Sequence, residues 1–168
     1  MSCEINKSLK KSAAIKIIGF GNIFMGDDAI GIRVLEEIKK QDIFKDNENV
    51  ELIEGGTSGV DLIFILQNAD KAIIVDAVNA GQPVGQITVF NLKNIKEFVK
   101  KKKPLRSFSF HDIDLLEIFE LINTLKIEKD IIIVGINPKK IGYSDKLSDE
   151  IEKKIPEIIL QVKKEAGV

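Results

Sequence analysis

Three side chains in this sequence could together hold a metal ion. Asp28 ends a glycine-containing segment, Asp76 follows an apolar run, and His111 is the single histidine of the chain. Two carboxylates and one imidazole form a three-ligand site with open coordination positions, which suits zinc or nickel better than magnesium or calcium. Because the three residues are far apart in the sequence, only the fold can bring them together.

Each of these residues also has a purely structural interpretation. An aspartate before a helix accepts hydrogen bonds from free backbone N–H groups and opposes the helix dipole, which can account for Asp27 or Asp28. Asp76 can accept backbone hydrogen bonds in a turn. A lone histidine such as His111 is most often a surface or hydrogen-bonded residue. The residue types alone leave both interpretations open.

The segment GFGNIFMGDD, residues 19–28, lacks the residues of the common phosphate-binding loops. A dinucleotide fingerprint needs glycine where this chain has Phe24, and a P-loop needs lysine and then serine or threonine after Gly26. The chain has Asp27 and Asp28 there instead. Carboxylates at the start of a helix attract cations and repel the anions that such a helix end would otherwise bind. A nucleotide-binding module is therefore a minor alternative.

Two other glycine positions indicate close packing. Gly31 lies inside a predicted helix, where glycine costs about 1 kcal/mol relative to alanine, so we expect another segment to pack closely on that turn. The segment EGGTSG, residues 54–59, follows a predicted strand, and its glycines would let a peptide backbone approach closely. Ser58 and Asp61 also fit a capping box, which is the structural explanation of this loop.

The elements that must position these residues alternate along the chain. Four short runs rich in β-branched residues are typical of buried parallel strands, at 15–19, 50–53, 72–75 and 131–135. Apolar residues spaced by three and four predict helices between them: Ile30, Val34 and Ile38; Leu62, Ile65 and Leu66; and Leu115, Ile118, Phe119, Ile122 and Leu125. A last helix is expected over residues 148–164, broken near Pro156.

This alternation predicts a doubly wound α/β fold with right-handed crossovers. Residues 1–13 are expected to be a flexible tail, and residues 14–168 a single domain. Residues 85–90 follow the Asp76 strand after a turn too short for a helix, so we expect them to join the sheet edge antiparallel. Ligands of open α/β sheets bind beyond the carboxyl ends of the strands, where Asp28 and Asp76 are expected.

Composition argues against several classes of protein. Of 168 residues, 44% are hydrophobic and 30% charged, and the net charge of −1 provides no field that would attract nucleic acid or an anionic membrane. The lysine run 100–103 is expected to be a solvated loop. Cys3 is the single cysteine, so no disulfide within the chain and no cysteine-based zinc site can form. Lys16 interrupts the only stretch that resembles a signal peptide, and no uncharged apolar run is long enough to cross a bilayer. We expect a soluble cytoplasmic protein.

The chain resembles the NiFe-hydrogenase maturation endopeptidases over roughly residues 15–145. The resemblance is carried by GFGNIFMGDDAIG at 19–31, EGGTSG at 54–59, IVDA at 74–77, His111 before a helix, and VGINP at 134–138. The order and spacing of these segments together are specific to the family.

The resemblance implies a site, a substrate and a fold. The family's two metal-contacting acids fall on Asp28 and Asp76, and its histidine falls on His111, with Asp27 as the neighbouring carboxylate. The implied substrate is the hydrogenase large-subunit precursor, cut after nickel insertion. The nickel is borne by this substrate, and zinc or cadmium could substitute for it. The resemblance also implies a monomer with a twisted five-stranded sheet, mostly parallel with one antiparallel edge strand, in a three-layer α/β/α arrangement. The substrate-binding loop would contain Gly55, Gly56 and Thr57.

A phospho-receiver-like signalling domain, with Asp76 as the acceptor, is the main alternative. Receivers also keep an acidic pair after the first strand. Their pair follows the strand directly, however, and their Lys-Pro after the last strand is replaced here by Asn137-Pro138-Lys139. A receiver would also give His111 no role.

For an endopeptidase, two mechanisms stay open. The three side chains could grip the substrate's nickel as a checkpoint, or a bound metal could polarise the peptide carbonyl and lower the pKa of a water molecule. A Ser-His-Asp arrangement is not expected with the only histidine committed, and Cys3 is a poor candidate for a nucleophile.

Overall fold

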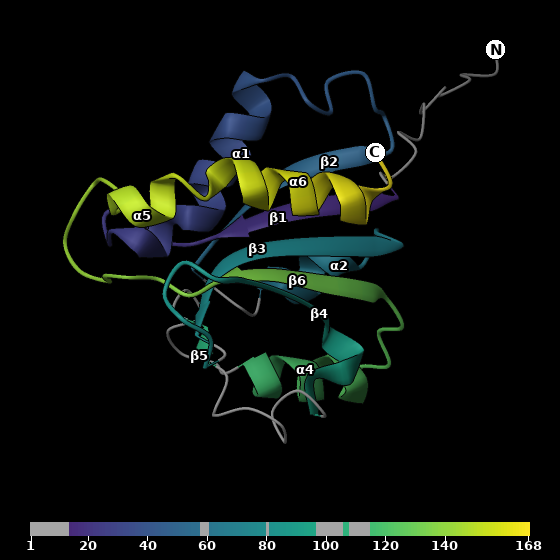
Figure 1. Cartoon of the computed structure of the whole chain (residues 1–168). Coiled ribbons are helices and arrows are strands. Elements are labelled where there is room, and N and C mark those ends of the chain that lie inside the picture. The colour runs from purple at the N-terminus through teal and green to yellow at the C-terminus, as the bar shows by residue number, and fades with distance from the viewer. Residues whose placement is uncertain (1–13, 58–60, 80, 97–105, 108–114) are drawn as a thin grey trace, which may run out of the picture.

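The computed structural model describes residues 14–57, 61–79, 81–96, 106–107 and 115–168, and these form a sheet between two layers of helices (Figure 1). Five strands lie in the order β2 (Val50–Gly56), β1 (Ile15–Phe20), β3 (Lys71–Asn79), β6 (Asp130–Ile136) and β4 (Ile87–Asn91). The first four are parallel, and β4 pairs antiparallel with β6 at the edge. The predicted fold class, including the antiparallel edge strand, is confirmed.

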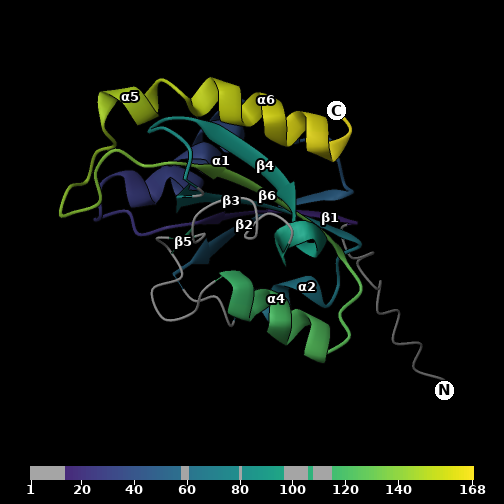
Figure 2. The same ribbon diagram turned by 60° about the horizontal axis from the view of Figure 1, so that its bottom comes forward.

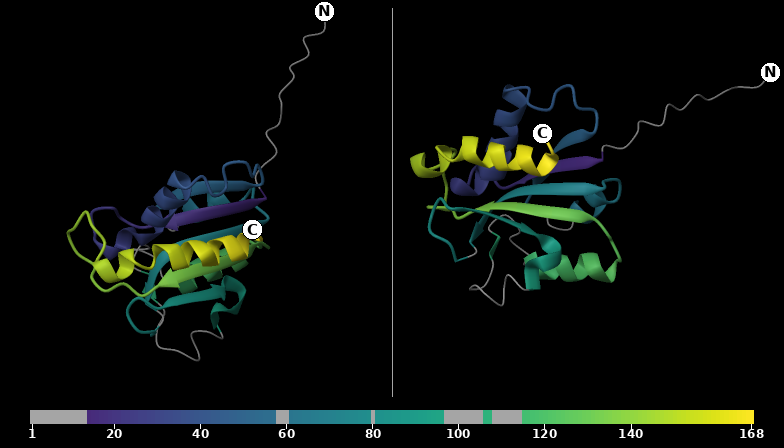
Figure 3. Two further views of the ribbon diagram at one scale, coloured as in Figure 1. Left: turned by 45° about the horizontal axis from the view of Figure 1, so that its top comes forward. Right: turned by 45° about the vertical axis from the view of Figure 1, so that its right-hand side comes forward.

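Helices cover both faces of the sheet (Figure 2). Helices α1 (Ile30–Lys40), α5 (Asp149–Glu152) and α6 (Ile155–Ala166) lie on one face, and α2 (Asp61–Leu66) and α4 (Leu115–Thr124) lie on the other. In Figure 3, yellow α6 crosses the sheet on the side opposite to green α4. Each face has its own apolar core, because alternate strand residues point to opposite sides.

Most residues of the predicted apolar stripes that the structure describes are buried. Ile30, Val34 and Ile38 are fully buried in α1, whereas Leu125 is 51% exposed and lies beyond the end of α4, so its assignment to the stripe was wrong. The last helix is divided, as predicted. It is interrupted between Glu152 and Ile155, and Pro156 lies in the first turn of α6, where its missing N–H leaves no hydrogen bond unmade.

Strand β3 is the central strand of the sheet, and it continues past the apolar run that predicts it. Asp76 lies inside the strand, opposite Gly135 of β6, because β3 extends to Asn79. The short β5 (Arg106–Ser107) pairs antiparallel with this extension. Asp76 was expected to follow the strand, and the long-range pairing with β6 and β5 explains why it does not.

The strand order creates a switch point between β1 and β3. From β1 the chain passes through α1, on one face, to β2; it then passes through α2, on the other face, to β3 on the far side of β1. In doubly wound sheets, ligands bind in the crevice outside the carboxyl ends of the strands at such a point.

Several sequence predictions concern residues outside the described part of the chain. These are the tail with Cys3, Ser58 of the capping box, the lysine run 100–103, and His111. Within the part that is described, no helix is both long and apolar enough to span a membrane.

Candidate active site

Asp28 and Asp76 lie on the two sides of the switch point. Asp28 belongs to the 3₁₀ turn η1 (Asp27–Ala29), which connects β1 to α1 and contacts β3. Pairing between β1 and β3 ends at Gly19 and Val75, so Asp76 is the first β3 residue beyond the end of that pairing. Both aspartates have no exposed surface. Two buried carboxylates from different elements therefore occupy the same edge of the sheet.

The loop after β1 folds back over the strand end to place Asp28. The Asp28 carboxylate accepts a hydrogen bond of 2.8 Å from the backbone N–H of Asn22. Gly21 has a φ of 141°, and a Cβ there would collide with the carbonyl oxygen of Asp28, so only glycine permits this close approach. Neither Asp27 nor Asp28 caps α1, because its N-cap is Ala29, with no side-chain hydrogen bond. The capping interpretation was wrong.

Both carboxylate oxygens of Asp27 accept hydrogen bonds from residues that are distant in the sequence. Its Oδ2 atom accepts hydrogen bonds from the backbone N–H groups of Lys139, at 2.9 Å, and Lys140, at 2.8 Å, and from the hydroxyl of Ser148, at 2.9 Å. Its Oδ1 atom accepts a hydrogen bond of 2.6 Å from the backbone N–H of Ser148. These four hydrogen bonds occupy both oxygens of Asp27. The contacts of the Asp27 carboxylate are therefore structural.

The close packing predicted at Gly31 is present, and it is structural. A Cβ at Gly31 would collide with the backbone carbonyl oxygens of Phe20 and Val75, and a Cβ at Gly19 would collide with the carbonyl oxygen of Gly31. The first turn of α1 thus lies directly on the ends of β1 and β3. This contact sets the position of η1 relative to Asp76.

Asp76 shares a strand face with residues that pack against α4. Ala72, Ile74 and Val78 belong to the apolar core on the α2 and α4 side, and Asp76 has the same alternation along β3. Its side chain therefore points toward the layer that contains α4. Because β5 pairs with Val78 and Asn79, Ser107 lies beside the carboxyl end of β3.

The glycine segment, Gly55 to Thr57, adjoins the loop after β1. It was expected to follow the strand, but β2 extends to Gly56, so Gly55 and Gly56 belong to the strand and Thr57 follows it. The backbone N–H of Gly21 donates a hydrogen bond of 2.9 Å to the carbonyl oxygen of Gly56. Gly55 is buried, and a Cβ there would lie 2.6 Å from the ring of Phe20, so this glycine has a packing role. Gly56 and Thr57 are exposed, and a Cβ at Gly56 would have open space around it. The backbone of Gly56 and Thr57 therefore lies at the surface.

A polar network fixes the connection between β3 and β4. The side-chain amide of Asn137 donates a hydrogen bond of 2.7 Å to the carbonyl oxygen of Gln82, and the backbone N–H of Gly85 donates one of 2.8 Å to the carbonyl oxygen of Asn137. Next to it, Lys139 forms an ion pair of 3.0 Å with Glu150. The hydrogen bond to Glu150 and the charge of its carboxylate raise the pKa of Lys139.

No group of three or more His, Cys, Asp or Glu residues suited to a metal lies in the part of the chain that the structure describes. His111, the predicted imidazole ligand, lies outside that part.

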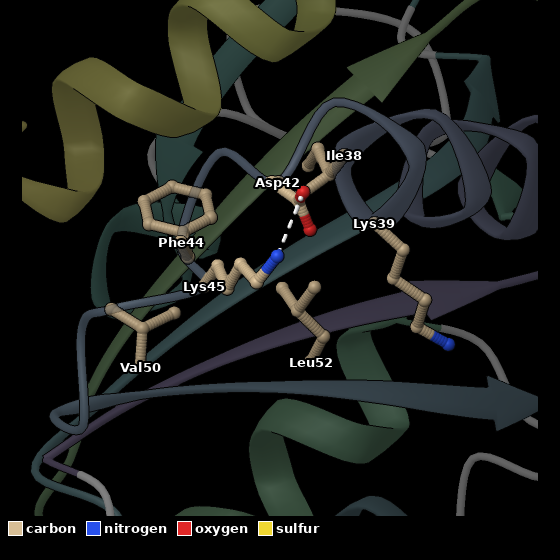
Figure 4. A pocket seen from close by; sticks show the side chains of 7 residues that line it. All are labelled: Ile38, Lys39, Asp42, Phe44, Lys45, Val50 and Leu52. Carbon is tan, nitrogen blue, oxygen red and sulfur yellow. Dashed lines mark hydrogen bonds and ion pairs between the residues drawn. The ribbon is translucent and has the colours of Figure 1, made fainter.

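A cavity of about 280 Å³ lies away from this edge (Figure 4). It is formed by the end of α1 and the amino end of β2, where Phe44, Val50 and Leu52 provide apolar walls. Of its charged residues, Lys45 forms an ion pair with Asp42 at 3.1 Å. The cavity offers no combination of residues for the chemistry considered above.

Comparison with known proteins identifies the family. The sequence model of the hydrogenase maturation proteases matches residues 32–165, which is most of the chain. The chain belongs to the hydrogenase maturation protease family. This confirms the resemblance predicted from the sequence motifs.

Individual members of the hydrogenase maturation protease family are similar along most of the chain. A putative hydrogenase maturation protease from Methanocaldococcus jannaschii is 30% identical over 166 residues, covering 92% of this chain and 99% of that protein. The structure of the hydrogenase maturating endopeptidase HybD from Escherichia coli has a TM-score of 0.71 and 25% identity, covering 91% and 93% of the two chains. The hydrogenase expression/formation protein HupD from Thiocapsa roseopersicina is 26% identical over 149 residues, which are 88% of this chain, but the chain spans only 65% of the length of that relative.

In this member of the family, the structure brings together the predicted site residues that it describes. Asp28, Asp76, Gly56 and Thr57 lie at one edge of the sheet. His111 lies outside the described residues. The roles of Asp27 and Asn137 were missed, because their partners are distant in sequence and have no recognisable local signal.

Proposed function

We propose that this protein is an endopeptidase that removes the C-terminal extension of a NiFe-hydrogenase large-subunit precursor after nickel insertion. In this proposal Asp28, Asp76 and His111 engage the nickel ion carried by the precursor. The protein acts as a monomer on this one partner. Membership in the hydrogenase maturation protease family supports the activity, and the geometry at the switch point supports the site.

The observation that carries the proposal is the burial of two carboxylates on either side of the switch point. Asp28 and Asp76 belong to separate elements that meet where ligands of such sheets bind. Carboxylate oxygens are ligands of divalent metals, so two of them at this point suit a site that engages a metal ion.

Chain connectivity supports His111 as the third ligand. Ser107 pairs with Val78, two residues after Asp76, at the carboxyl end of β3. His111 is four residues after Ser107, and four residues of chain span at most about 14 Å. His111 can therefore reach the side of the sheet to which Asp76 points. Two carboxylates and an imidazole leave coordination positions open for ligands that the precursor itself supplies.

The residues then have distinct roles. Asp28, Asp76 and His111 bind the precursor's nickel and thereby hold the neighbouring peptide at the carboxyl edge. Gly55 keeps the end of β2 packed on Phe20, while Gly56 and Thr57 present open backbone to the peptide. Binding in this way positions one peptide bond for hydrolysis and couples cutting to the presence of the metal.

The alternative of a phospho-receiver has no support from these contacts. Asp27, the acidic residue that would bind magnesium beside Asp76, has both oxygens occupied by hydrogen bonds to residues 139, 140 and 148. Incubation with magnesium and a small phosphodonor is expected to leave the protein unmodified.

The deciding experiment mixes the protein with nickel-loaded large-subunit precursor and follows the precursor mass by mass spectrometry. Wild-type protein should shorten the precursor at its C-terminus. Asp76→Asn is nearly isosteric and should remain folded but leave the precursor intact. A second carboxylate variant, Glu48→Gln, is the matched control, because Glu48 lies in an exposed loop far from the carboxyl edge. An intact precursor with the wild type, or cutting by Asp76→Asn at the wild-type rate, would refute the proposal.

A further inference from the structure

We propose that Asp27 is a positioning residue for Asp28: it anchors the η1 turn to the segment after β6, and this anchor sets where the Asp28 carboxylate lies. The inference deepens the proposed function and rests on it. Asp27 itself touches neither substrate nor metal in this proposal.

The anchor joins three segments that are distant in sequence. The Asp27 carboxylate receives hydrogen bonds from Lys139 and Lys140, which follow β6, and from Ser148, which precedes α5. These partners are 112, 113 and 121 residues away along the chain. With an exposure of 1%, Asp27 is shielded from water, so water cannot readily replace a lost partner.

Backbone pairing strengthens the same connection. The N–H of Gly26 donates to the carbonyl oxygen of Ser144 at 2.9 Å, and the N–H of Asp27 donates to that of Lys140 at 3.1 Å. A Cβ at Gly26 would lie 3.0 Å from the carbonyl oxygen of Lys140, so the two segments are in close contact. The residue before Asp28 is thus held through both its backbone and its side chain.

The contacts of Asp27 determine where Asp28 lies. It directly follows Asp27 in a turn of three residues, and its own carboxylate is held by the N–H of Asn22. If the Asp27 anchor is weakened, the turn can rotate, and the Asp28 carboxylate moves relative to Asp76. The N–H of Asn22 then loses its acceptor or forms a longer hydrogen bond. The Asn22 amide therefore reports directly on the position of the Asp28 carboxylate.

Two substitutions weaken the anchor to different degrees. Asp27→Asn keeps the shape of the side chain but leaves one acceptor oxygen, and its NH₂ group must face at least one of the existing donors. Ser148→Ala removes only the hydroxyl that donates to Oδ2 and leaves the three backbone donors in place. Val162→Ala is the control for lost stability, because Val162 is buried in α6, outside both the anchor and the site.

The experiment measures the Asn22 amide, by chemical shift and hydrogen exchange, together with kcat and KM for nickel-loaded precursor. We expect Asp27→Asn to speed exchange of the Asn22 amide about tenfold and to lower kcat about tenfold, corresponding to about 1.4 kcal/mol, while KM stays within about twofold. Ser148→Ala should change the same quantities in the same direction by a smaller factor. Val162→Ala should change neither while the protein remains folded.

The outcomes separate this inference from the proposed function. A wild-type Asn22 signal in Asp27→Asn, or in Ser148→Ala if Asp27→Asn does not fold, would overturn the anchor. An equal loss of kcat in Val162→Ala would show that the loss in Asp27→Asn comes from lower stability, and this would also overturn the positioning role of Asp27. If wild-type protein does not cut the precursor, the proposed function fails, while the Asn22 amide still decides whether Asp27 positions Asp28.

Discussion

The carboxylate of Asp28 accepts a hydrogen bond of 2.8 Å from the backbone N–H of Asn22, six residues earlier in the chain. The loop between β1 and α1 is therefore closed by the same side chain that faces the switch point. One residue combines a structural contact with a candidate functional group, and the two contributions can be separated by the choice of substitution.

Asp28→Asn should separate them, because asparagine keeps an oxygen that can accept from Asn22 but removes the negative charge. We expect a folded protein whose cleavage rate falls about 100-fold or more, since a metal-binding anion is lost. Asp28→Ala should lose activity and also about 1–3 kcal/mol of stability, because the Asn22 N–H loses its acceptor. Urea unfolding and mass spectrometry of the precursor measure the two effects. Wild-type cleavage by Asp28→Asn would remove Asp28 from the site.

Gly31→Ala provides a test of how η1 is positioned. Alanine normally stabilises a helix interior by about 1 kcal/mol relative to glycine. Here its Cβ would collide with the backbone carbonyl oxygens of Phe20 and Val75, so we expect a net destabilisation of about 1–3 kcal/mol or more, measured by urea unfolding.

Gly142→Ala is the matched control for this prediction. A Cβ at Gly142 would meet no atom within 4 Å, so the change should alter stability by less than about 0.5 kcal/mol. Equal stability of the Gly31 and Gly142 variants would contradict the packing account.

The strands and the contact at Gly31 could be predicted from the sequence because both have a local signal. A run of β-branched residues indicates a buried strand wherever it pairs, and a glycine within a helical stripe indicates close contact whatever the partner is. The same reasoning placed Asp76 at the carboxyl edge. It missed the extension of β3 to Asn79, because that extension depends on pairing with β6 and β5.

The role of Asp27 could not be predicted either, because it also depends on contacts between residues that are distant in the sequence. Two adjacent aspartates before a helix suggest capping, and the residue types alone do not tell their roles apart. The role of Asp27 arises from Lys139, Lys140 and Ser148, which the fold brings to it from positions more than a hundred residues away. Asn137 is similar, since its partner Gln82 is 55 residues away.

Cleavage should not respond to reagents directed at serine or cysteine nucleophiles. The only histidine is assigned to the metal, so neither nucleophile class has a general base. We expect Cys3→Ala, and wild-type protein treated with a thiol-alkylating or serine-directed reagent, to cut nickel-loaded precursor at rates within about twofold of the untreated wild type. A serine protease and a cysteine protease treated in parallel serve as controls for the reagents. Loss of cutting in Cys3→Ala would require a thiol mechanism.

The order of nickel insertion and cutting is the most specific consequence of the proposed site. Three protein ligands leave coordination positions that an ion bound to the precursor can fill, and a site of this kind is expected to hold free metal only weakly. A nickel-free precursor should therefore remain uncut, and addition of nickel to that precursor should restore cutting without any change to the protein. The test uses matched precursor samples with and without nickel, each treated with wild type and with His111→Ala, and mass spectrometry measures the product. Wild type should cut only the nickel-loaded sample, and His111→Ala should cut neither, because removal of the imidazole leaves two carboxylates to bind the ion.

Efficient cutting of the nickel-free sample by the wild type would contradict the checkpoint and favour a metal held by the protein itself. Full activity of His111→Ala would contradict both mechanisms, since each assigns the imidazole to the metal.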